Sequence, residues 1–216
     1  MTFYTDAQRK LQDAFDSRKL ADTLEVAILQ DHLDDRHAEF IASRDFFFLS
    51  TVTAEGHPTV SYKGGGVGTV TVVDERTLAF PAYDGNGMFL SMGNIDETAK
   101  IGMLFIDFET PNRVRVQATA TINPDDELMA QYPGALLIVR ATIDQVFVNC
   151  ARYIHKHTRV EQSKYVPDDD GEQPVATWKR IDVLQDALTD EDQSAADGEG
   201  LITMEQYAEA LEAGES

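Results

Sequence analysis

The sequence contains one cysteine, Cys150, among its 216 residues. A single cysteine cannot form an intramolecular disulfide or a thiolate metal site, and its scarcity fits a reducing compartment. The apolar runs, such as residues 46–49 and 102–106, are much too short to cross a bilayer. The N-terminus also lacks the basic and apolar stretches of a signal peptide. We therefore expect a cytoplasmic protein.

Basic residues are scarce as well. The chain has 18 lysines and arginines against 38 acidic residues, which gives a formal net charge of -20. Residues 161–216 hold 16 acidic and 3 basic residues, whereas residues 1–160 hold 22 and 15. A polyanionic surface repels phosphates and anionic lipids, so nucleic acids and membranes are excluded as partners.

Residues 3–45 show apolar side chains at spacings of three and four without Gly or Pro, which predicts two or three helices that cover a sheet. From residue 46 onward the sequence is rich in aromatic and β-branched residues, in runs that are separated by short turns. Strands are expected at residues 46–52, 59–63, 67–73, 77–81, 100–107, 113–122 and within 135–148. A short helix is expected near residues 88–94, and a helix with a turn at 123–135. This close succession predicts a mainly β protein with flanking helices (α+β), an antiparallel barrel or sandwich.

The C-terminal stretch, residues 161–216, is acidic, and its pattern differs from that of the strand-rich part before it. Residues 168–172 and 190–200 are expected to be solvated loops, and residues 181–188 and 204–211 short amphipathic segments. Thr203 and Gln206 have the spacing of a capping box. A calcium loop with Gly200 at its glycine position would need acidic ligands at Ala195 and Gln206, so that interpretation fails.

Three short stretches hold the candidate chemistry: residues 62–65, 80–89 and 93–95. They place one lysine, several glycines and two asparagines close to strand ends. Glycines let a backbone approach a flat ring or a phosphate, and amides can bond its polar edge. Asp-Gly and Asn-Gly are also ordinary turn sequences, so composition alone leaves both interpretations open.

The runs FFFLSTVTAEGHPTVSYKGGGVG, FPAYDGNGMFLSMGNI and IGMLFIDFETPNRVRVQATATI together resemble the pyridoxamine 5'-phosphate oxidase-like flavoproteins. The segment NCARYIHK, residues 149–156, resembles the C-terminal signature of the oxidase-related branch. The resemblance covers about residues 40–160. It implies an antiparallel split β-barrel homodimer that holds FMN at the subunit interface. The implied organisation is a helical segment packed on the barrel (1–45), the FMN-binding barrel (46–160) and an acidic extension with short helices (161–216).

The resemblance also implies a set of cofactor-binding residues, while the catalytic residues remain unknown. In the oxidases a strand cation and a basic Ser-Arg-Lys loop hold the phosphate. Here Lys63 matches the cation, but residues 85–88 have lost the basic pair, which argues against pyridoxamine phosphate oxidation. The candidate cofactor-binding residues are Ser61, Tyr62, Lys63, Pro81, Tyr83, Asp84, Gly85, Asn86, Gly87, Met88, Asn94, Arg113, Arg115, Arg152, Tyr153 and His155.

Several of these residues have an ordinary structural interpretation too. Arg113 and Arg115 share one strand face and either bind an anion or solvate the strand. Arg152, Tyr153 and His155 either face the flavin or form a solvated segment. His155 and His157 would share a strand face, yet no third ligand is placed to complete a metal site, so none is expected. Cys150 is expected to be a small core residue.

The sequence thus favours an FMN-dependent oxidoreductase acting on a small molecule, with a nicotinamide as one candidate donor. In such proteins the flavin does the redox chemistry and the protein binds and tunes it. The alternatives are a flavin or haem carrier without enzymatic activity, a true pyridoxamine phosphate oxidase, and a deazaflavin-binding relative.

Overall fold

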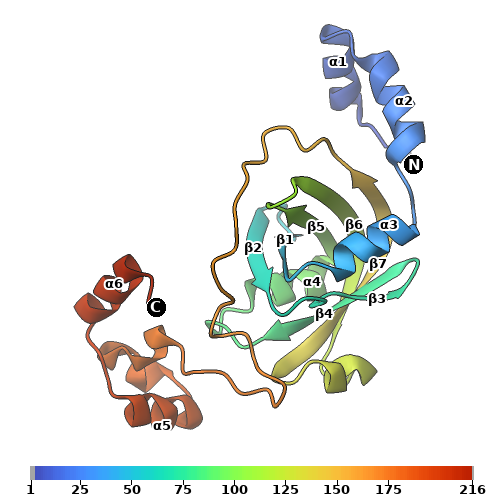
Figure 1. Cartoon of the computed structure of the whole chain (residues 1–216). Helices are drawn as coiled ribbons and strands as arrows, with labels where there is room; N and C mark the ends of the chain where they lie inside the picture. The colour runs from blue at the N-terminus through green and yellow to red at the C-terminus, as the bar shows by residue number, and fades with distance from the viewer. Residues whose placement is uncertain (1–2, 216) are drawn as a thin grey trace. The chain divides into compact units, whose positions relative to one another are not determined.

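The computed structural model describes residues 3–215, and the chain divides into two compact units, residues 1–160 and 161–216. The first unit is a strongly curved sheet with helices, and the second is a group of short helices (Figure 1). Each unit is described by itself.

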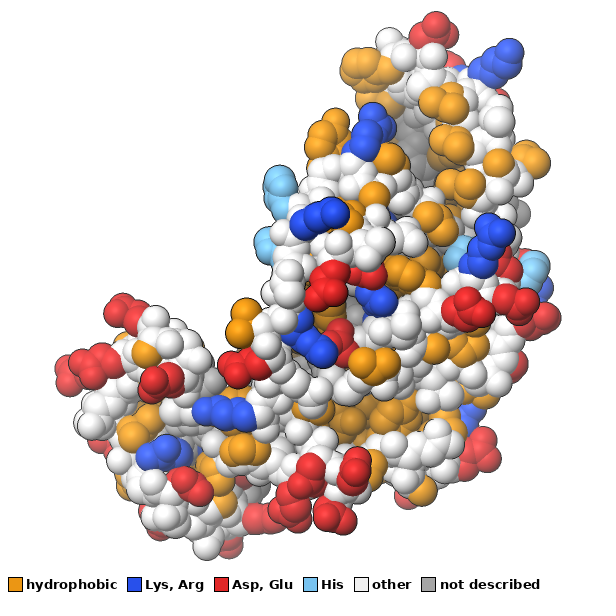
Figure 2. Space-filling view, viewed as in Figure 1, with side chains coloured by type: hydrophobic (Ala, Val, Ile, Leu, Met, Phe, Trp, Pro, Cys, Tyr) orange, Lys and Arg blue, Asp and Glu red, His pale blue; other side chains and the backbone are white. Residues whose placement is uncertain are grey.

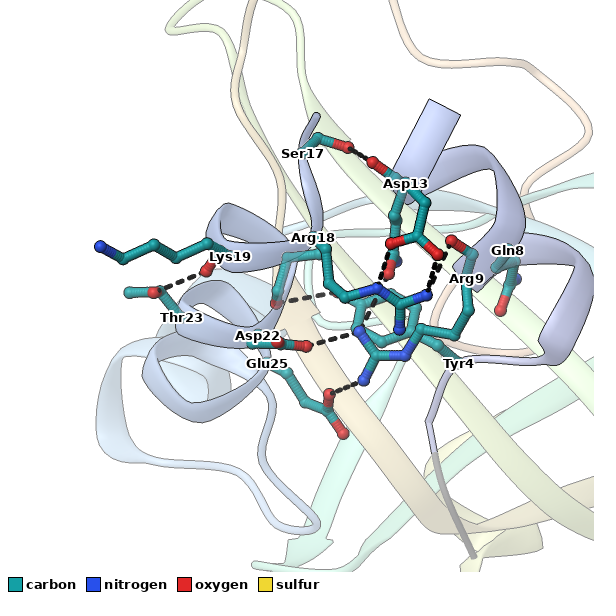
Figure 3. Close-up of polar contacts among 12 residues, drawn as sticks. Tyr4, Gln8, Arg9, Asp13, Ser17, Arg18, Lys19, Asp22, Thr23 and Glu25 are labelled. Atoms are coloured by element: carbon teal, nitrogen blue, oxygen red, sulfur yellow. Dashed lines mark hydrogen bonds and ion pairs between the residues drawn. The ribbon is translucent and has the colours of Figure 1, made fainter. Parts of the chain in front are cut away.

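The first unit begins with a helical hairpin, α1 (Asp6–Ala14) and α2 (Arg18–Ile28). The guanidinium of Arg9 on α1 pairs with the carboxylates of Asp22 and Glu25 on α2 (Figure 3). These groups keep a good part of their surface in water, so each pair stabilises the hairpin only modestly.

The apolar side chains of this hairpin stay largely in solvent. Neither helix contains a buried residue, and Figure 2 shows hydrophobic side chains spread over its surface. The next helix, α3 (Asp35–Ala42), does bury side chains, those of His37 and Ile41. The exposed large apolar residues of the hairpin are Leu11, Phe15, Leu20, Leu24 and Val26.

Seven antiparallel strands form one sheet within the described residues, in the order β2-β1-β5-β6-β7-β4-β3. With its flanking helices, the sheet confirms the predicted α+β split barrel. The strands are β1 (Phe46–Val52), β2 (Pro58–Gly64), β3 (Thr71–Asp74), β4 (Thr77–Tyr83), β5 (Lys100–Asp107), β6 (Asn112–Asn123) and β7 (Ala135–Val148).

Alternate residues of these strands point into the main core, and a smaller buried cluster lies around Tyr132. Phe47 is the centre of the main core: the ring lies 5.0 Å from that of Phe80 and 5.4 Å from that of Phe105, measured between centroids. All three side chains are almost completely buried. Aromatic groups of this size dominate the apolar surface removed from water. Their neighbours in sequence therefore point to the outer face of the sheet.

Helix α4 (Leu90–Thr98) closes this core from one side and contributes Met92 and Ile95 to it. Its apolar residues are few because it also carries polar groups toward the sheet. The 3-10 helix η1 (Glu127–Gln131) covers part of the outer face and is tied to β7 by Arg140, whose Nε donates to Oδ2 of Asp126 at 2.6 Å.

The second unit contains the 3-10 helices η2 (Thr177–Arg180) and η3 (Asp182–Ala187), then α5 (Asp190–Glu199) and α6 (Met204–Ala213). The expected capping box of Thr203 with Gln206 starts α6 and is confirmed.

The expectation of a loop at residues 190–200 is wrong, because residues 190–199 form α5. The hydroxyl of Thr189 caps this helix by accepting the amide of Asp192. Three acidic residues then occupy its first turn, where the helix dipole favours negative charge. The high acidic content thus marks a helix start and not only a solvated loop.

Other predicted elements need smaller corrections. The strand expected at residues 67–73 is β3, and it begins only at Thr71, after a loop. The helix expected near residues 88–94 is α4, which begins at Leu90 and runs to Thr98. Within residues 3–215, no helix is both long and apolar enough to span a membrane.

Candidate functional site

Polar contacts fix α4 on the edge of the sheet formed by β1 and β2. Nδ2 of Asn94 donates to Oγ1 of Thr51 at 2.9 Å, and the Thr98 hydroxyl donates to a backbone carbonyl of β1 at 3.0 Å. One turn earlier on the helix, the hydroxyls of Ser91 and Ser61 lie 3.3 Å apart. Three residues on one helix face therefore hold α4 in a defined register on the strands.

This register determines where the helix begins. Thr51 pairs with Thr59 in the β1–β2 ladder. The middle of α4 therefore lies next to Thr59, and its first turn lies next to Ser61. The helix thus runs antiparallel to β2. Lys63 lies on the same face of β2 as Ser61, roughly 7 Å further along the strand. Its side chain therefore extends from the strand beyond the N-terminal end of α4.

The backbone of Lys63 belongs to the β1–β2 ladder, but its ammonium group has no hydrogen bond or ion pair with any residue that the structure describes. The side chain is partly buried, and burial lowers the pKa of its ammonium group. A cation in this setting lacks the solvation that water would give it. A bound anion would supply the missing counter-charge.

The loop before α4 offers the other half of an anion site. Residues 84–90 are all exposed. Gly87 and Phe89 both adopt a left-handed backbone conformation, with φ of 72° and 49°, and Oδ1 of Asn86 accepts the amide of Met88 at 3.2 Å. Phe89 gives α4 no side-chain cap. The first amides of the helix therefore point outward without a side-chain acceptor, which is the arrangement that binds phosphate groups.

The sequence suggested that the Asn94 side chain contacts the cofactor, whereas the structure places it against the sheet. The side chain is buried, 8% exposed, and its amide is engaged with Thr51. Asn94 therefore positions α4 and, through it, the candidate anion site at the start of the helix. Ser91 and Thr51, which sequence reasoning missed, act with it. The spacing of Ser91, Asn94 and Thr98 on one helix face is the signal that could have identified them.

Pro81 and Tyr83 end β4, the strand that leads into the loop. Alternate residues of β4 point to the main core, whereas Pro81 is buried on the other face. A register shift between Ala82 and Tyr83 interrupts the ladder with β7. Tyr83 is half-buried, and burial raises the pKa of its phenol. Both residues thus shape the start of the loop.

Tyr62, Arg113 and Arg115 lie on the outer face of the sheet, opposite Lys63. The outer face carries a row of directly paired residues across neighbouring strands: Tyr62, Phe48, Leu104, Arg115 and Phe147. Tyr62 is 62% exposed and stacks on Phe46 at 5.3 Å. Within one chain, the structure therefore separates these three residues from the Lys63 side chain.

Residues 149–160 form an irregular segment across one end of the sheet. Nη2 of Arg113 on β6 donates to the carbonyl of Cys150 at 2.9 Å, and the amide of His157 donates to the carbonyl of Phe108, just after β5, at 3.2 Å. Arg159 then pairs with Asp45 before β1. The segment is therefore held at both ends.

Arg152, Tyr153 and His155 occupy the middle of that segment and are all exposed. The Tyr153 side chain is 91% exposed, its φ is 71°, and the Arg152 guanidinium lies 6.0 Å from the ring centroid. His155 and His157 do not lie in a strand. Among the described residues, no three His, Cys, Asp or Glu side chains are grouped closely enough to hold a metal ion.

Cys150 is exposed, so its expected place in the core is wrong. It lies two residues after Val148, the last residue of β7, where the chain leaves the sheet. The backbone amide of Arg152 approaches the sulfur, and this contact lowers the pKa of the thiol.

Comparison with known proteins identifies a family. Residues 33–160 match the family model for pyridoxamine 5'-phosphate oxidase, which covers more than half of the chain. No curated protein matches this sequence significantly.

Solved structures resemble parts of the chain at low identity. A Lactobacillus delbrueckii protein, provisionally assigned as a pyridoxamine 5'-phosphate oxidase, is 25% identical, with 55% of this chain and 95% of that one covered and a TM-score of 0.46. An FMN-binding protein from Syntrophomonas wolfei is 11% identical (65% and 97% covered, TM-score 0.43). HutZ, the heme storage protein of Vibrio cholerae, is 21% identical (54% and 94% covered, TM-score 0.41).

Proposed function

The chain belongs to the pyridoxamine 5'-phosphate oxidase family, and we propose that it is a cytoplasmic, homodimeric FMN-dependent oxidoreductase acting on a small molecule. The observation that carries the proposal is the unpaired Lys63 beside the uncapped start of α4. A cation and outward-pointing helix amides form a site of the right charge and chemistry for the FMN phosphate.

Bound there, FMN would supply the redox chemistry, and the protein would bind and orient it. Lys63 and the first amides of α4 hold the phosphate. Ser61, which touches Ser91, keeps the strand and the helix start together. The remaining loop donors lie at residues 84–88, whose exposure leaves room for a flat ring.

The outer face of the sheet supports the homodimer in this proposal. Val60 and Tyr62 are 69% and 62% exposed, and the Tyr62 ring packs against the rings of Phe46 and Phe48. A contiguous apolar and aromatic patch on a soluble protein marks an interaction surface. A second copy placed on it would bring Arg113 and Arg115 into an interface.

The substrate side of the flavin is assigned to Arg152, Tyr153 and His155. Their side chains are exposed on a segment that is held at both ends. A guanidinium beside an aromatic ring suits an anionic, planar molecule. We extend this to a nicotinamide dinucleotide as the electron donor, because its rings are planar and its phosphates are anionic.

The test is an absorption spectrum of the purified full-length protein before and after FMN addition and desalting. We expect flavin bands that survive desalting, and a much lower retention of riboflavin, because riboflavin lacks the phosphate that Lys63 binds. Equal retention of both would contradict the phosphate site. A colourless protein would overturn the flavin assignment, and a haem band in its place would favour the carrier function.

A further inference from the structure

The N-terminal hairpin exposes the apolar residues of both its helices. Leu11 on α1 and Phe15 at its end are four residues apart, so they share one side of the helix. Leu20 and Leu24 share one side of α2 in the same way. Their exposed fractions are 60%, 78%, 61% and 41%. An amphipathic helix on a protein surface normally turns such a side toward a core, so the hairpin lacks a covering partner.

The two helices of the hairpin meet through their polar sides (Figure 3). Asp13 on α1 pairs with Arg18, and Asp22 on α2 pairs with Arg9. Each of these two carboxylates is two residues away from an apolar residue named above, and residues two apart point to different sides of a helix. The apolar sides therefore point away from the contact between α1 and α2, where the helices cannot cover them.

The outer face of β1 and β2 is a second uncovered surface. Although 26% of the chain is charged, no residue on this face is. The Tyr62 ring stacks on Phe46, and a Cβ at Gly64 would lie 2.7 Å from its Cε1, so the ring is held in place. A fixed, exposed aromatic ring suits the centre of an interface. The paired residues of this face are Phe46 and Gly64, Phe48 and Tyr62, Ser50 and Val60, and Val52 and Pro58.

These two surfaces lie at opposite ends of the sheet. The hairpin is attached at the end of β7: the Phe3 ring lies 5.9 Å from the Phe147 ring, and the backbone of Gln30 forms two hydrogen bonds with Val146. Three strands separate β7 from β2, which corresponds to roughly 19 Å along the sheet. Within one chain the hairpin and β2 therefore do not cover each other, whereas a second copy can supply the missing surface to each.

The charges of the outer face favour contact between different strands over contact between identical ones. If β6 faced β6, Arg115 would meet Arg115 of the partner subunit, and like charges in an interface are unfavourable. In the reverse strand order, Arg115 meets Phe48 of the partner subunit, and Tyr62 meets Phe147 of the partner subunit. Residues 6–28 hold five acidic and four basic residues, so the hairpin can approach a second acidic chain without large repulsion.

We propose that the two subunits of the dimer exchange their N-terminal hairpins. Each hairpin packs its apolar residues against the outer face of β1 and β2 in a second copy of the chain, and a two-fold axis forms the contact twice. The hairpin precedes residues 33–160, so it lies outside the part of the chain that matches the family. This inference rests on the homodimer of the proposed function and names surfaces that form it.

Cross-linking between full-length chains with one cysteine each tests the contact itself. Cys150→Ser removes the native thiol, and Leu20→Cys or Val60→Cys then places one thiol on the hairpin or on β2. A short bismaleimide should join the two kinds of chain into covalent dimers when they are co-expressed, and should leave each kind alone as single chains. Dimers from Leu20→Cys alone would mean that hairpins pair with each other, and dimers from Val60→Cys alone that β2 meets β2. Either result overturns the exchange, as does a co-expressed sample without cross-links.

Sedimentation velocity tests the contribution of the hairpin to assembly. Phe15→Glu should raise the dissociation constant of the dimer at least about tenfold. The matched control is Val26→Glu: Val26 is 88% exposed and two residues from Leu24, so it lies on another side of α2 and should change nothing. If Phe15→Glu dimerises normally while Val60→Glu is monomeric, the exchange is overturned and the proposed dimer stands. A monomeric unsubstituted protein would instead contradict the homodimer itself.

Discussion

At the residue scale, Lys63 is the side chain on which the flavin proposal depends most. We expect Lys63→Met to weaken FMN binding about ten- to a hundredfold, the loss of a charge-assisted hydrogen bond. Lys10→Met, at an exposed lysine of α1, should leave the dissociation constant unchanged. Both constants are measured by quenching of flavin fluorescence.

The same residue sets a pH dependence. Burial lowers the pKa of Lys63 in the free protein, and a bound phosphate favours its protonated form. FMN affinity should therefore fall as the pH rises through this lowered pKa, before the value of about 10.4 of an exposed lysine is reached. The fall should be absent in Lys63→Met. An identical pH profile in both proteins would remove Lys63 from the phosphate site.

Sequence could identify Lys63 because a lone cation among glycines stands out in an acidic chain. It could not assign the role of Asn94, because an asparagine near a glycine-rich loop can donate a hydrogen bond to a ligand or to a residue of a neighbouring strand equally well. The partner, Thr51, is 43 residues away in sequence, and that contact exists only in the folded sheet. The sequence-based prediction placed Cys150 in the core for a related reason: its exposure depends on where β7 ends, which the sequence does not show.

At the scale of elements, α4 ends in a conformation that its sequence does not favour. Ala99, its C-terminal cap, has a φ of 58°, in the left-handed region where a side chain costs free energy. We expect Ala99→Gly to raise the free energy of unfolding by about 0.5–1 kcal/mol.

The control for this substitution is Ala42→Gly, at an exposed position that ends α3 in helical conformation. There the same change should lower the free energy of unfolding by up to about 1 kcal/mol. Urea denaturation followed by circular dichroism measures both. If the two variants shift stability in the same direction, the left-handed cap of α4 is not strained.

The elements that sequence predicts best are those whose patterns are purely local. Residues 113–122 alternate strictly, and they fall within β6. The helix at residues 190–199 was not predicted, because five acidic residues without an apolar stripe resemble a solvated loop. A cap at Thr189 and buried Ala196 make that stretch helical.

At the scale of the whole molecule, the exposed aromatic face of β1 and β2 should control assembly. We expect Val60→Glu to shift the protein from dimer to monomer, because a carboxylate would be buried in an interface built from apolar side chains. Val183→Glu, at a valine in the second unit that is 72% exposed, should leave the dimer intact. Sedimentation velocity distinguishes the two. A dimeric Val60→Glu protein would place the interface elsewhere.

The only tryptophan of the chain, Trp178, lies in η2 and therefore belongs to the second unit. Indole emission excited at the red edge of absorption thus reports on residues 161–216 alone, while a bound flavin would report on the sheet. Two optical signals from one sample could then follow the melting of the two units separately. Energy transfer from the indole to the flavin would add a molecular ruler between them.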